Sequence, residues 1–203
     1  MAMVNYEPRG AALDLLKCKA PEVVLSGPAG TGKSVACLWK LHYCAAHIPG
    51  LRGLIVRKTR HSLTDSALVT YERDIIPDGH AALGGARREN RHAYHYPNGS
   101  ELVCGGMDKA SRVMSTEYDL IYVQEAIELA AEEWESLTTR LRNGKLPYQQ
   151  LLADTNPDKP LHWLKQRCDA RQALLLESRH QDNPMLWQNG DWTPFARKPD
   201  GSG

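Results

Sequence analysis

The sequence has 203 residues, and 25 Lys and Arg against 24 Asp and Glu give a formal net charge of +1. This length is typical of one domain with its own core, and 42% hydrophobic and 24% charged residues are ordinary for a globular protein. The near-neutral charge argues against a small, uniformly basic nucleic-acid module, and no apolar run approaches the roughly 18 residues of a transmembrane helix. Five cysteines without a C-x-x-C pair favour reduced thiols over a disulfide framework or a zinc site.

Short apolar runs alternate with helical patterns along the chain, which predicts an α/β fold with a mostly parallel sheet. Asn98-Gly99 between two alternating runs predicts a β-hairpin, inserted near residues 91–105. Residues 78–91 are rich in Gly, Arg and Asn and are predicted to form a loop. The expected strands are 22–26, 53–57, 119–123, 149–153 and 173–177, and the expected helices are 33–47, 62–74, 130–141 and 160–168.

Residues 27–34 read GPAGTGKS and match the phosphate-binding pattern G-x-x-x-x-G-K-[ST] between a predicted strand and a predicted helix. The glycines allow backbone N–H groups to surround phosphates, and the helix N-terminus adds its positive end. Lys33 can reach the β- and γ-phosphates, and the Ser34 hydroxyl can bind Mg²⁺. The sequence therefore predicts a site for ATP and Mg²⁺ formed by Gly27, Pro28, Ala29, Gly30, Thr31, Gly32, Lys33 and Ser34.

The predicted strand at 119–123 ends in Gln124-Glu125, which resembles a Walker B strand. A carboxylate at the tip of a strand next to the phosphate loop can position and deprotonate a water for attack on the γ-phosphate. Glu125 is the predicted catalytic base; the alternative is that it only begins a solvated helix with Glu128. Gln124 stands where such sites mostly have Asp, so it is expected to reach Mg²⁺ through a water but to bring no charge.

The strand at 149–153 runs into Asp154-Thr155-Asn156-Pro157. Polar side chains at this strand end, Thr155 and Asn156, could contact both the γ-phosphate and the attacking water and so report hydrolysis to the rest of the fold. Alone, Thr-Asn-Pro is a common turn, and only the two preceding motifs favour the functional interpretation.

Taken together, these motifs resemble the ATPase domain of bacteriophage terminase large subunits, the motors that package viral DNA. The order and spacing of the motifs agree over about residues 5–187, and the ordered set is more specific than any single motif. The matching segments are residues 6–10, 27–34, 54–59, 96–102, 105–107, 118–129, 155–157, 162–163 and 182–184.

The resemblance implies an ASCE-type P-loop NTPase fold and roles for further residues. Tyr6 and Arg9 lie where the family contacts the adenine. A neighbouring subunit often supplies an arginine that stabilises charge on the γ-phosphate; Arg112 is the first candidate for it and Arg57 the second, although either could be an ordinary surface arginine.

The resemblance also implies partners and a domain organisation. The implied partners are double-stranded DNA, the portal protein, the small terminase subunit and further copies of the chain in a ring of about five subunits. The chain would act in the host cytoplasm, docked transiently at the procapsid portal. Residues 1–187 are expected to form the ATPase domain and 188–203 a tail or linker. The family's C-terminal RNase-H-like nuclease domain has no counterpart here, so no nuclease activity is expected.

Rival functions share parts of this pattern. A helicase or another DNA-translocating ATPase has the same loop, carboxylate and coupling strand, and a nucleotide or small-molecule kinase shares the loop. A catalytically weak ATPase is a third alternative, because of Gln124 and the missing nuclease half. Basic clusters near residues 52–60, 87–91 and 140–145 are candidate DNA contacts, with 87–91 preferred, although each could be a solvated loop.

Overall fold

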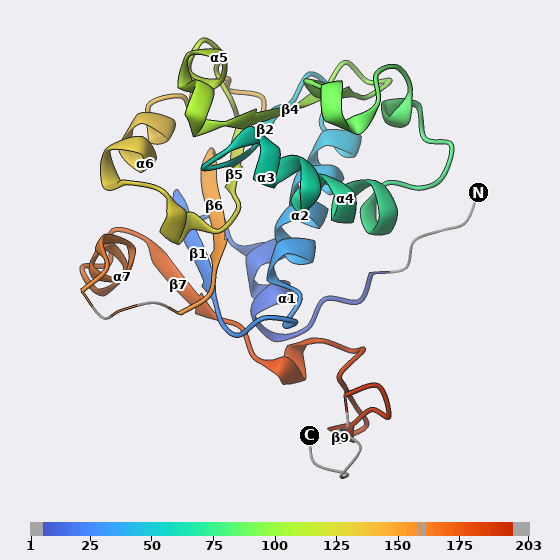
Figure 1. Ribbon diagram of the computed structural model, residues 1–203, viewed down its shortest axis with the longest axis vertical. Coiled ribbons are helices and arrows are strands. Elements are labelled where there is room, and N and C mark those ends of the chain that lie inside the picture. Colours follow the sequence, from blue (N-terminus) through green and yellow to red (C-terminus); the bar gives the residue numbers. More distant parts are fainter. Residues whose placement is uncertain (1–5, 158, 160, 197–203) are drawn as a thin grey trace.

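The computed structural model describes residues 6–157, 159 and 161–196, and it is built on one seven-stranded sheet (Figure 1). The strand order is β3-β4-β2-β5-β6-β1-β7, and every neighbouring pair is parallel except β3 with β4. This arrangement confirms the predicted α/β fold. The strands are β1 (Glu22–Ser26), β2 (Arg52–Arg57), β3 (Ala93–His95), β4 (Glu101–Gly106), β5 (Leu120–Val123), β6 (Gln150–Thr155) and β7 (Leu174–Glu177).

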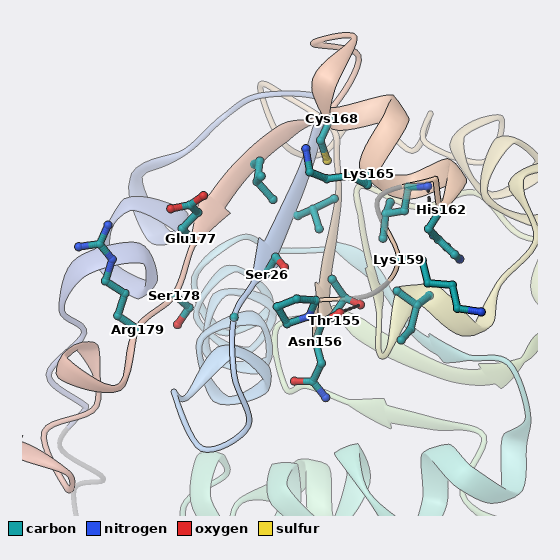
Figure 2. Close-up of a pocket in the computed structure, with 16 residues that line it drawn as sticks. Ser26, Thr155, Asn156, Lys159, His162, Lys165, Cys168, Glu177, Ser178 and Arg179 are labelled. Atoms are coloured by element: carbon teal, nitrogen blue, oxygen red, sulfur yellow. Dashed lines mark hydrogen bonds between the residues drawn. The ribbon is translucent and has the colours of Figure 1, made fainter. Parts of the chain in front are cut away.

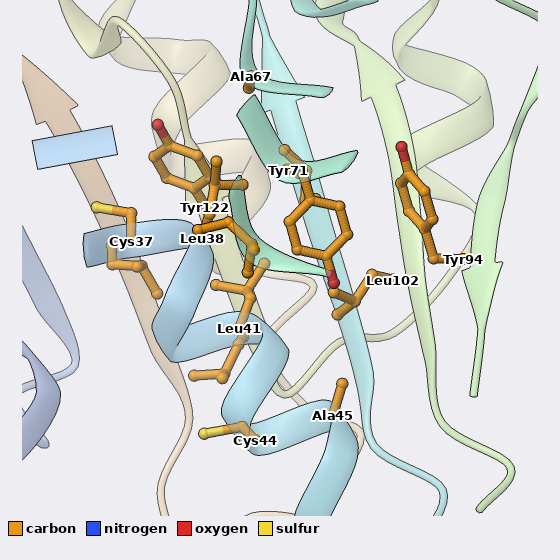
Figure 3. Packing of buried hydrophobic residues seen from close by; sticks show 14 of the residues in the cluster. Cys37, Leu38, Leu41, Cys44, Ala45, Ala67, Tyr71, Tyr94, Leu102 and Tyr122 are labelled. Atoms are coloured by element: carbon orange, nitrogen blue, oxygen red, sulfur yellow. The ribbon is translucent and has the colours of Figure 1, made fainter. Parts of the chain in front are cut away.

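Two apolar clusters cover the two faces of the sheet because successive strand residues point to opposite sides. Val23 and Leu25 of β1 join the first cluster, which lies under α1 (Gly10–Lys17) and α2 (Lys33–His47). Figure 3 shows α2 packed in this cluster against side chains such as Tyr71 and Tyr122. Val24 joins the second cluster, under α5 (Ala110–Met114), α6 (Ala131–Thr138) and α7 (Trp163–Asp169).

The prediction of one continuous helix at 62–74 is wrong. The structure has two short helices, α3 (Arg60–Asp65) and α4 (Ala67–Thr70), followed by a π-turn at Tyr71–Ile75. The break falls at Ser66, whose φ and ψ of −126° and −86° are not helical. Its hydroxyl donates to the Ser62 carbonyl at 2.5 Å, a local bond that competes with the helix.

The β-hairpin predicted near residues 91–105 is confirmed, since β3 and β4 pair antiparallel; β4 also pairs with β2, so the hairpin extends the main sheet. Helix α1 was not expected. The boundary expected between an ATPase domain at 1–187 and a tail at 188–203 stays a prediction; it coincides with β8 (Trp187–Gln188), which pairs with β9 (Asp191–Trp192). Residues 197–203 of the predicted tail lie outside the described residues.

No helix in the described part of the chain is both long and apolar enough to cross a lipid bilayer.

Candidate nucleotide-binding site

The loop between β1 and α2 has the backbone that a phosphate cradle requires. Gly30 and Gly32 have φ of 80° and 86°, in the left-handed region that glycine adopts without steric cost. The Thr31 hydroxyl donates to the Pro28 carbonyl at 3.1 Å and fixes the turn. Because α2 starts at Lys33, the free N–H groups of a 15-residue helix end at this loop, where they favour an anion.

Lys33 connects the loop to the end of β6. Its ammonium group donates to the carbonyls of Gly27 and Pro28, at 2.8 and 2.7 Å, and to Asn156 Oδ1 at 3.2 Å. Burial lowers the pKa of Lys33, while the carboxylates of Asp154 and Glu125 oppose this effect. The structure thus brings Asn156 to the phosphate loop. The side chain of Thr155 instead donates to the Asn156 carbonyl, at 3.0 Å.

A buried carboxylate that sequence reasoning does not single out lies at the centre of the site. Asp154 near the end of β6 is 1% exposed, and its Oδ2 accepts hydrogen bonds from the Ser34 hydroxyl and, at 3.0 Å, from the Tyr122 hydroxyl. Its Oδ1 accepts from the Glu125 backbone N–H at 2.9 Å. Burial raises the pKa of Asp154, and the bonds from Ser34, Glu125 and Tyr122 work in the opposite direction.

Glu125 follows β5 with φ of 50° and ψ of 59°, a left-handed backbone that is uncommon for a residue with a side chain. Its carboxyl group is half-buried. Burial and then the Asp154 carboxylate raise the pKa of Glu125, whereas Arg57 and Lys33 lower it. A raised pKa makes a carboxylate a stronger base for a water proton. The structure therefore brings Glu125 together with the phosphate loop and with the end of β6.

Gln124 lies at the same strand end, where its side chain contacts a serine. It is 6% exposed, and its Oε1, 2.8 Å from the Ser66 hydroxyl oxygen, shares the one hydrogen of that hydroxyl with the Ser62 carbonyl. Ser66 also accepts from Arg57 Nη1 at 3.1 Å, and Arg57 forms an ion pair with Glu128 at 2.6 Å. The expected Mg²⁺ contact of Gln124 would have to compete with Ser66, and the carboxylate that contacts Ser34 is Asp154.

The fit of the site to Mg²⁺ depends on oxygen donors, which this cation prefers. Ser34 offers a hydroxyl oxygen, and its hydrogen is accepted by the buried Asp154 carboxylate. Among the described residues, no group of three or more His, Cys, Asp and Glu side chains is placed to hold a metal ion. These residues therefore fit Mg²⁺ bound mainly through phosphate oxygens and water rather than in an all-protein cage.

The segment after β7 packs onto the phosphate loop. His180 Nε2 donates to the Ala29 carbonyl at 3.1 Å, and Asn183 Nδ2 donates to the Gly30 carbonyl at 2.7 Å. Arg9 Nη1 donates to the Trp187 carbonyl at 3.4 Å, so this predicted adenine contact lies beside the same segment. Tyr6 stacks on Trp39 of α2, with ring centroids 5.2 Å apart. Its ring is thus engaged by an aromatic partner in this structure.

A cavity of about 380 Å³ adjoins the site between the ends of β1 and β6 and helix α7 (Figure 2). Figure 2 shows Ser26 of β1, Thr155 of β6 and the following Asn156 at its border, with Lys165 and Cys168 of α7 on the opposite wall. Gly27 also lines this cavity, so it is continuous with the phosphate loop.

The arginines predicted to act between subunits lie in different places. Arg112 is exposed on α5, which packs beside β4; three strands separate β4 from β1. It therefore lies apart from the phosphate loop of its own chain. Arg57 lies at the end of β2 within the electrostatic reach of Glu125, so its position suits a role in its own chain's site.

The preferred DNA-contact loop at 87–91 needs correction. Arg91 is 7% exposed, and its guanidinium donates to the carbonyls of Ala82, Leu83 and Gly84, each at 2.9 Å. Arg88 pairs with Glu72 at 3.2 Å. These two arginines hold the loop together, which leaves Arg87 as its exposed cation. The basic residues Arg52, Arg57, Lys58 and Arg142 of the other two clusters also form ion pairs with Glu side chains.

Comparison with known proteins gives one family and a set of similar folds. The family model described as phage terminase large subunit matches residues 20–189. No curated protein matches the sequence significantly. The large terminase of a thermophilic bacteriophage in complex with ADP superposes with a TM-score of 0.68 at 18% identity, covering 86% of this chain and 46% of that one.

Two further large terminase structures have a fold similar to that of this chain. The same phage's terminase in a second crystal form has a TM-score of 0.66 at 14% identity, covering 90% of this chain and 48% of that chain. The ATPase domain of the Thermus phage P74-26 large terminase has a TM-score of 0.55 at 19% identity, covering 76% of this chain and 67% of that chain. The chain thus spans about half the length of the first two terminase chains.

Proposed function

The chain belongs to the phage terminase large subunit family, and from this premise we propose that it is the ATP-hydrolysing motor domain that moves double-stranded DNA into a procapsid. The observation that carries the proposal is a complete phosphate loop whose Lys33 and Ser34 contact the end of β6, with Glu125 beside them. Large terminase structures of similar fold have been obtained with ADP and with ATP-gamma-S.

The reaction would be in-line attack of a water on the γ-phosphate. The loop N–H groups and Lys33 would hold the β- and γ-phosphates and stabilise the charge that develops on them. Glu125 would orient the water and accept its proton, which a raised pKa favours. Asn156, already bonded to Lys33, would respond when the γ-phosphate leaves.

Ser34 would bind Mg²⁺ through its hydroxyl oxygen. The ion would neutralise charge on the phosphate oxygens. An arginine from a neighbouring subunit would complete the charge stabilisation, and the exposed position of Arg112 on α5 suits such a role.

The expected assembly is a ring of this chain, of about five copies, on the portal protein and with the small terminase subunit, in the host cytoplasm. DNA would be held through its phosphates without sequence readout. Since Arg88 and Arg91 are engaged within the fold, Arg87 is the residue of the 87–91 loop that remains available for such contacts.

The experiment that tests the proposal is steady-state ATP hydrolysis with and without linear double-stranded DNA, for the wild type, Lys33→Ala and Glu125→Gln. We expect DNA to stimulate the wild type. Glu125→Gln should lower the turnover rate about 10²- to 10⁴-fold while ADP still binds, because only the proton acceptor is lost. Glu132→Gln, on the exposed side of α6, is the matched control and should hydrolyse ATP like the wild type.

Two outcomes would contradict the proposal. If the Glu125→Gln variant hydrolysed ATP as fast as the wild type, Glu125 would not be the catalytic base. ATP-dependent phosphorylation of a nucleotide or another small acceptor, without any response to DNA, would indicate a kinase instead.

A further inference from the structure

The position that precedes Glu125 at the end of β5 brings no negative charge for a divalent cation. Gln124 is neutral, and its amide oxygen lies 2.8 Å from the Ser66 hydroxyl, whose one hydrogen it shares with the Ser62 carbonyl. Mg²⁺ is a hard cation that favours anionic oxygen. A functional site in this chain therefore requires a carboxylate from somewhere other than position 124.

Asp154 lies where such a carboxylate is needed, beside the Ser34 hydroxyl. It is on β6, which lies between β5 and β1, so its side chain can contact residues from both neighbours. Oδ2 contacts the Ser34 hydroxyl at the start of α2, and Oδ1 contacts the Glu125 N–H after β5. A single buried carboxylate thus joins the phosphate loop to the residue that follows the Walker-B-like strand.

The direction of the hydrogen bond to Ser34 matters for metal binding. A serine that binds a cation through oxygen must send its hydrogen elsewhere, and in this structure Asp154 Oδ2 accepts it. The bond turns the serine lone pairs away from Asp154 and leaves them available to an ion on the loop side. Partners of this kind orient a metal ligand and typically change metal affinity 10- to 100-fold when they are replaced.

The buried charge of Asp154 is stabilised by hydrogen bonds and not by a direct ion pair among the described residues. Three donors contact its carboxylate, from Ser34, Tyr122 and the Glu125 backbone. The Lys33 ammonium acts on it only through the electrostatic field, because it bonds to two carbonyls and to Asn156. A divalent cation on Ser34 would supply the missing positive charge.

We infer that Asp154 is the positioning residue for Mg²⁺: it accepts the Ser34 hydrogen and provides the negative charge that Gln124 lacks. The inference rests on the proposed function, because it assumes that a nucleotide and Mg²⁺ occupy this loop. The same carboxylate holds the left-handed backbone of Glu125 through Oδ1, so loading of the ion and placement of the base depend on one side chain.

The test measures nucleotide binding rather than turnover. The affinity of the full chain for a fluorescent N-methylanthraniloyl ADP is determined in EDTA and in millimolar Mg²⁺, and the ratio of the two affinities is the gain due to Mg²⁺. We expect a clear gain in the wild type and a gain at least about tenfold smaller in Asp154→Asn, with affinity in EDTA changed by less than about threefold. A loss of fold alone would lower both affinities.

Matched variants separate the alternatives. Asp119→Asn neutralises another fully buried carboxylate, one that precedes β5 at the other end of the strand, and should keep the wild-type gain. In a Ser34→Ala background, Asp154→Asn should cause a smaller loss of the gain than it does in the wild type, because the part of its effect that acts through the Ser34 hydroxyl is already absent. Should Asp154→Asn not fold, Asp154→Ser, which leaves room for a water, is measured in its place with the same expectation.

Each contrary outcome has a distinct meaning. An unchanged gain in Asp154→Asn would overturn the inference, and a loss confined to Gln124→Ala would return the role to Gln124. A loss in the Ser34→Ala background as large as in the wild type would show that Asp154 does not act through Ser34. A wild type without any Mg²⁺-dependent ADP binding would instead contradict the proposed function.

Discussion

At the scale of single residues, the site depends on one unusual backbone position. A non-glycine residue in the left-handed region costs about 1 kcal/mol or more. Glu125 adopts it and its N–H is bonded to Asp154, so the strain is offset by a buried hydrogen bond. The result is a carboxyl group at the end of β5 that lies within the electrostatic reach of both Arg57 and Lys33.

The pH dependence of hydrolysis should report on this carboxyl group. Because burial and Asp154 raise the pKa of Glu125 above its ordinary value of 4.5, Glu125 becomes protonated at a higher pH than a solvated glutamate. A protonated Glu125 cannot accept a proton from water, so the turnover rate should fall on the acid side with an apparent pKa above 4.5. Turnover measured from pH 5 to 9 checks this; a constant rate down to pH 5 would contradict it.

Gly27 is required for a different reason, the close approach of another chain segment. A Cβ at this position would lie 2.1 Å from the Ser178 carbonyl oxygen, in backbone just after β7. Gly27→Ala should therefore destabilise the fold by about 1–3 kcal/mol and weaken ADP binding, since the loop must move. Urea unfolding and ADP titration measure the two effects.

The control for this substitution is Gly84→Ala. Gly84 is exposed with φ of −64°, and its added Cβ would approach only the Ala81 carbonyl, at 3.2 Å. Its effect on stability should stay within about 1 kcal/mol. Equal losses in the two variants would show that the contact with Ser178 is not the cause.

At the scale of elements, helix α2 combines a phosphate-binding end with an aromatic middle. His42 in this helix is 8% exposed, lies among Tyr71, His80 and Tyr96, and forms a 2.7 Å hydrogen bond to the Tyr96 hydroxyl. Burial, with smaller contributions from His80 and His47, lowers the pKa of His42 from 6.5 to about 4. The folded chain therefore keeps this histidine neutral over a pH range in which the unfolded chain protonates it.

Stability should consequently decrease in mild acid. The contribution of His42 is present above pH 6.5 and is lost as the pH falls from 6.5 toward 4, amounting to about 2 kcal/mol between pH 7.5 and pH 5. Urea unfolding of the wild type and of His42→Gln at both pH values measures it: the variant should lose about 2 kcal/mol less than the wild type. Equal losses would mean that His42 is protonated in the fold.

Local patterns predict the elements that depend on local sequence, and the phosphate loop is the best example. Its glycines, lysine and serine are consecutive, and the flanking strand and helix are strongly patterned, so the sequence predicts both its structure and its position. The tips of β5 and β6 were also predictable, because buried strands end there in polar residues. The break at Ser66 was not, because its cause is a hydroxyl that bonds within the chain and to Gln124, 58 residues away.

The role of Asp154 and the burial of Arg91 show why the rest could not be predicted. The role of Asp154 can be recognised only once β6 is known to lie between β5 and β1, and this strand order cannot be read from the composition. Arg91 looks like part of a basic cluster, but its partners are three carbonyls at 82–84 that carry no sequence signal. A strand-end acid followed by the Thr-Asn-Pro turn was the one available clue to Asp154.

At the scale of the whole molecule, Arg112 on α5 lies apart from the phosphate loop of its own chain. The exposed Arg112 would serve a neighbouring copy, and in a ring each site would then combine Glu125 of one chain with Arg112 of the next. Such an arginine contributes about 10³-fold or more to the rate.

Mixing two variants tests this arrangement. Arg112→Ala and Glu125→Gln should each hydrolyse ATP poorly, but a 1:1 mixture should regain activity at about a quarter of the interfaces, where an intact Glu125 meets an intact Arg112. Turnover of the mixture is compared with the mean of the separate variants under conditions of assembly. A mixture that only equals this mean would exclude Arg112 as the shared residue.

The bonds from His180 to Ala29 and from Asn183 to Gly30 have a mechanical consequence. Through these two hydrogen bonds, the segment after β7 is attached directly to backbone carbonyls of the phosphate loop. In the proposed motor, tension on the segment after Asn183 would act on the phosphate loop itself, and a movement of the loop on hydrolysis would in turn move that segment.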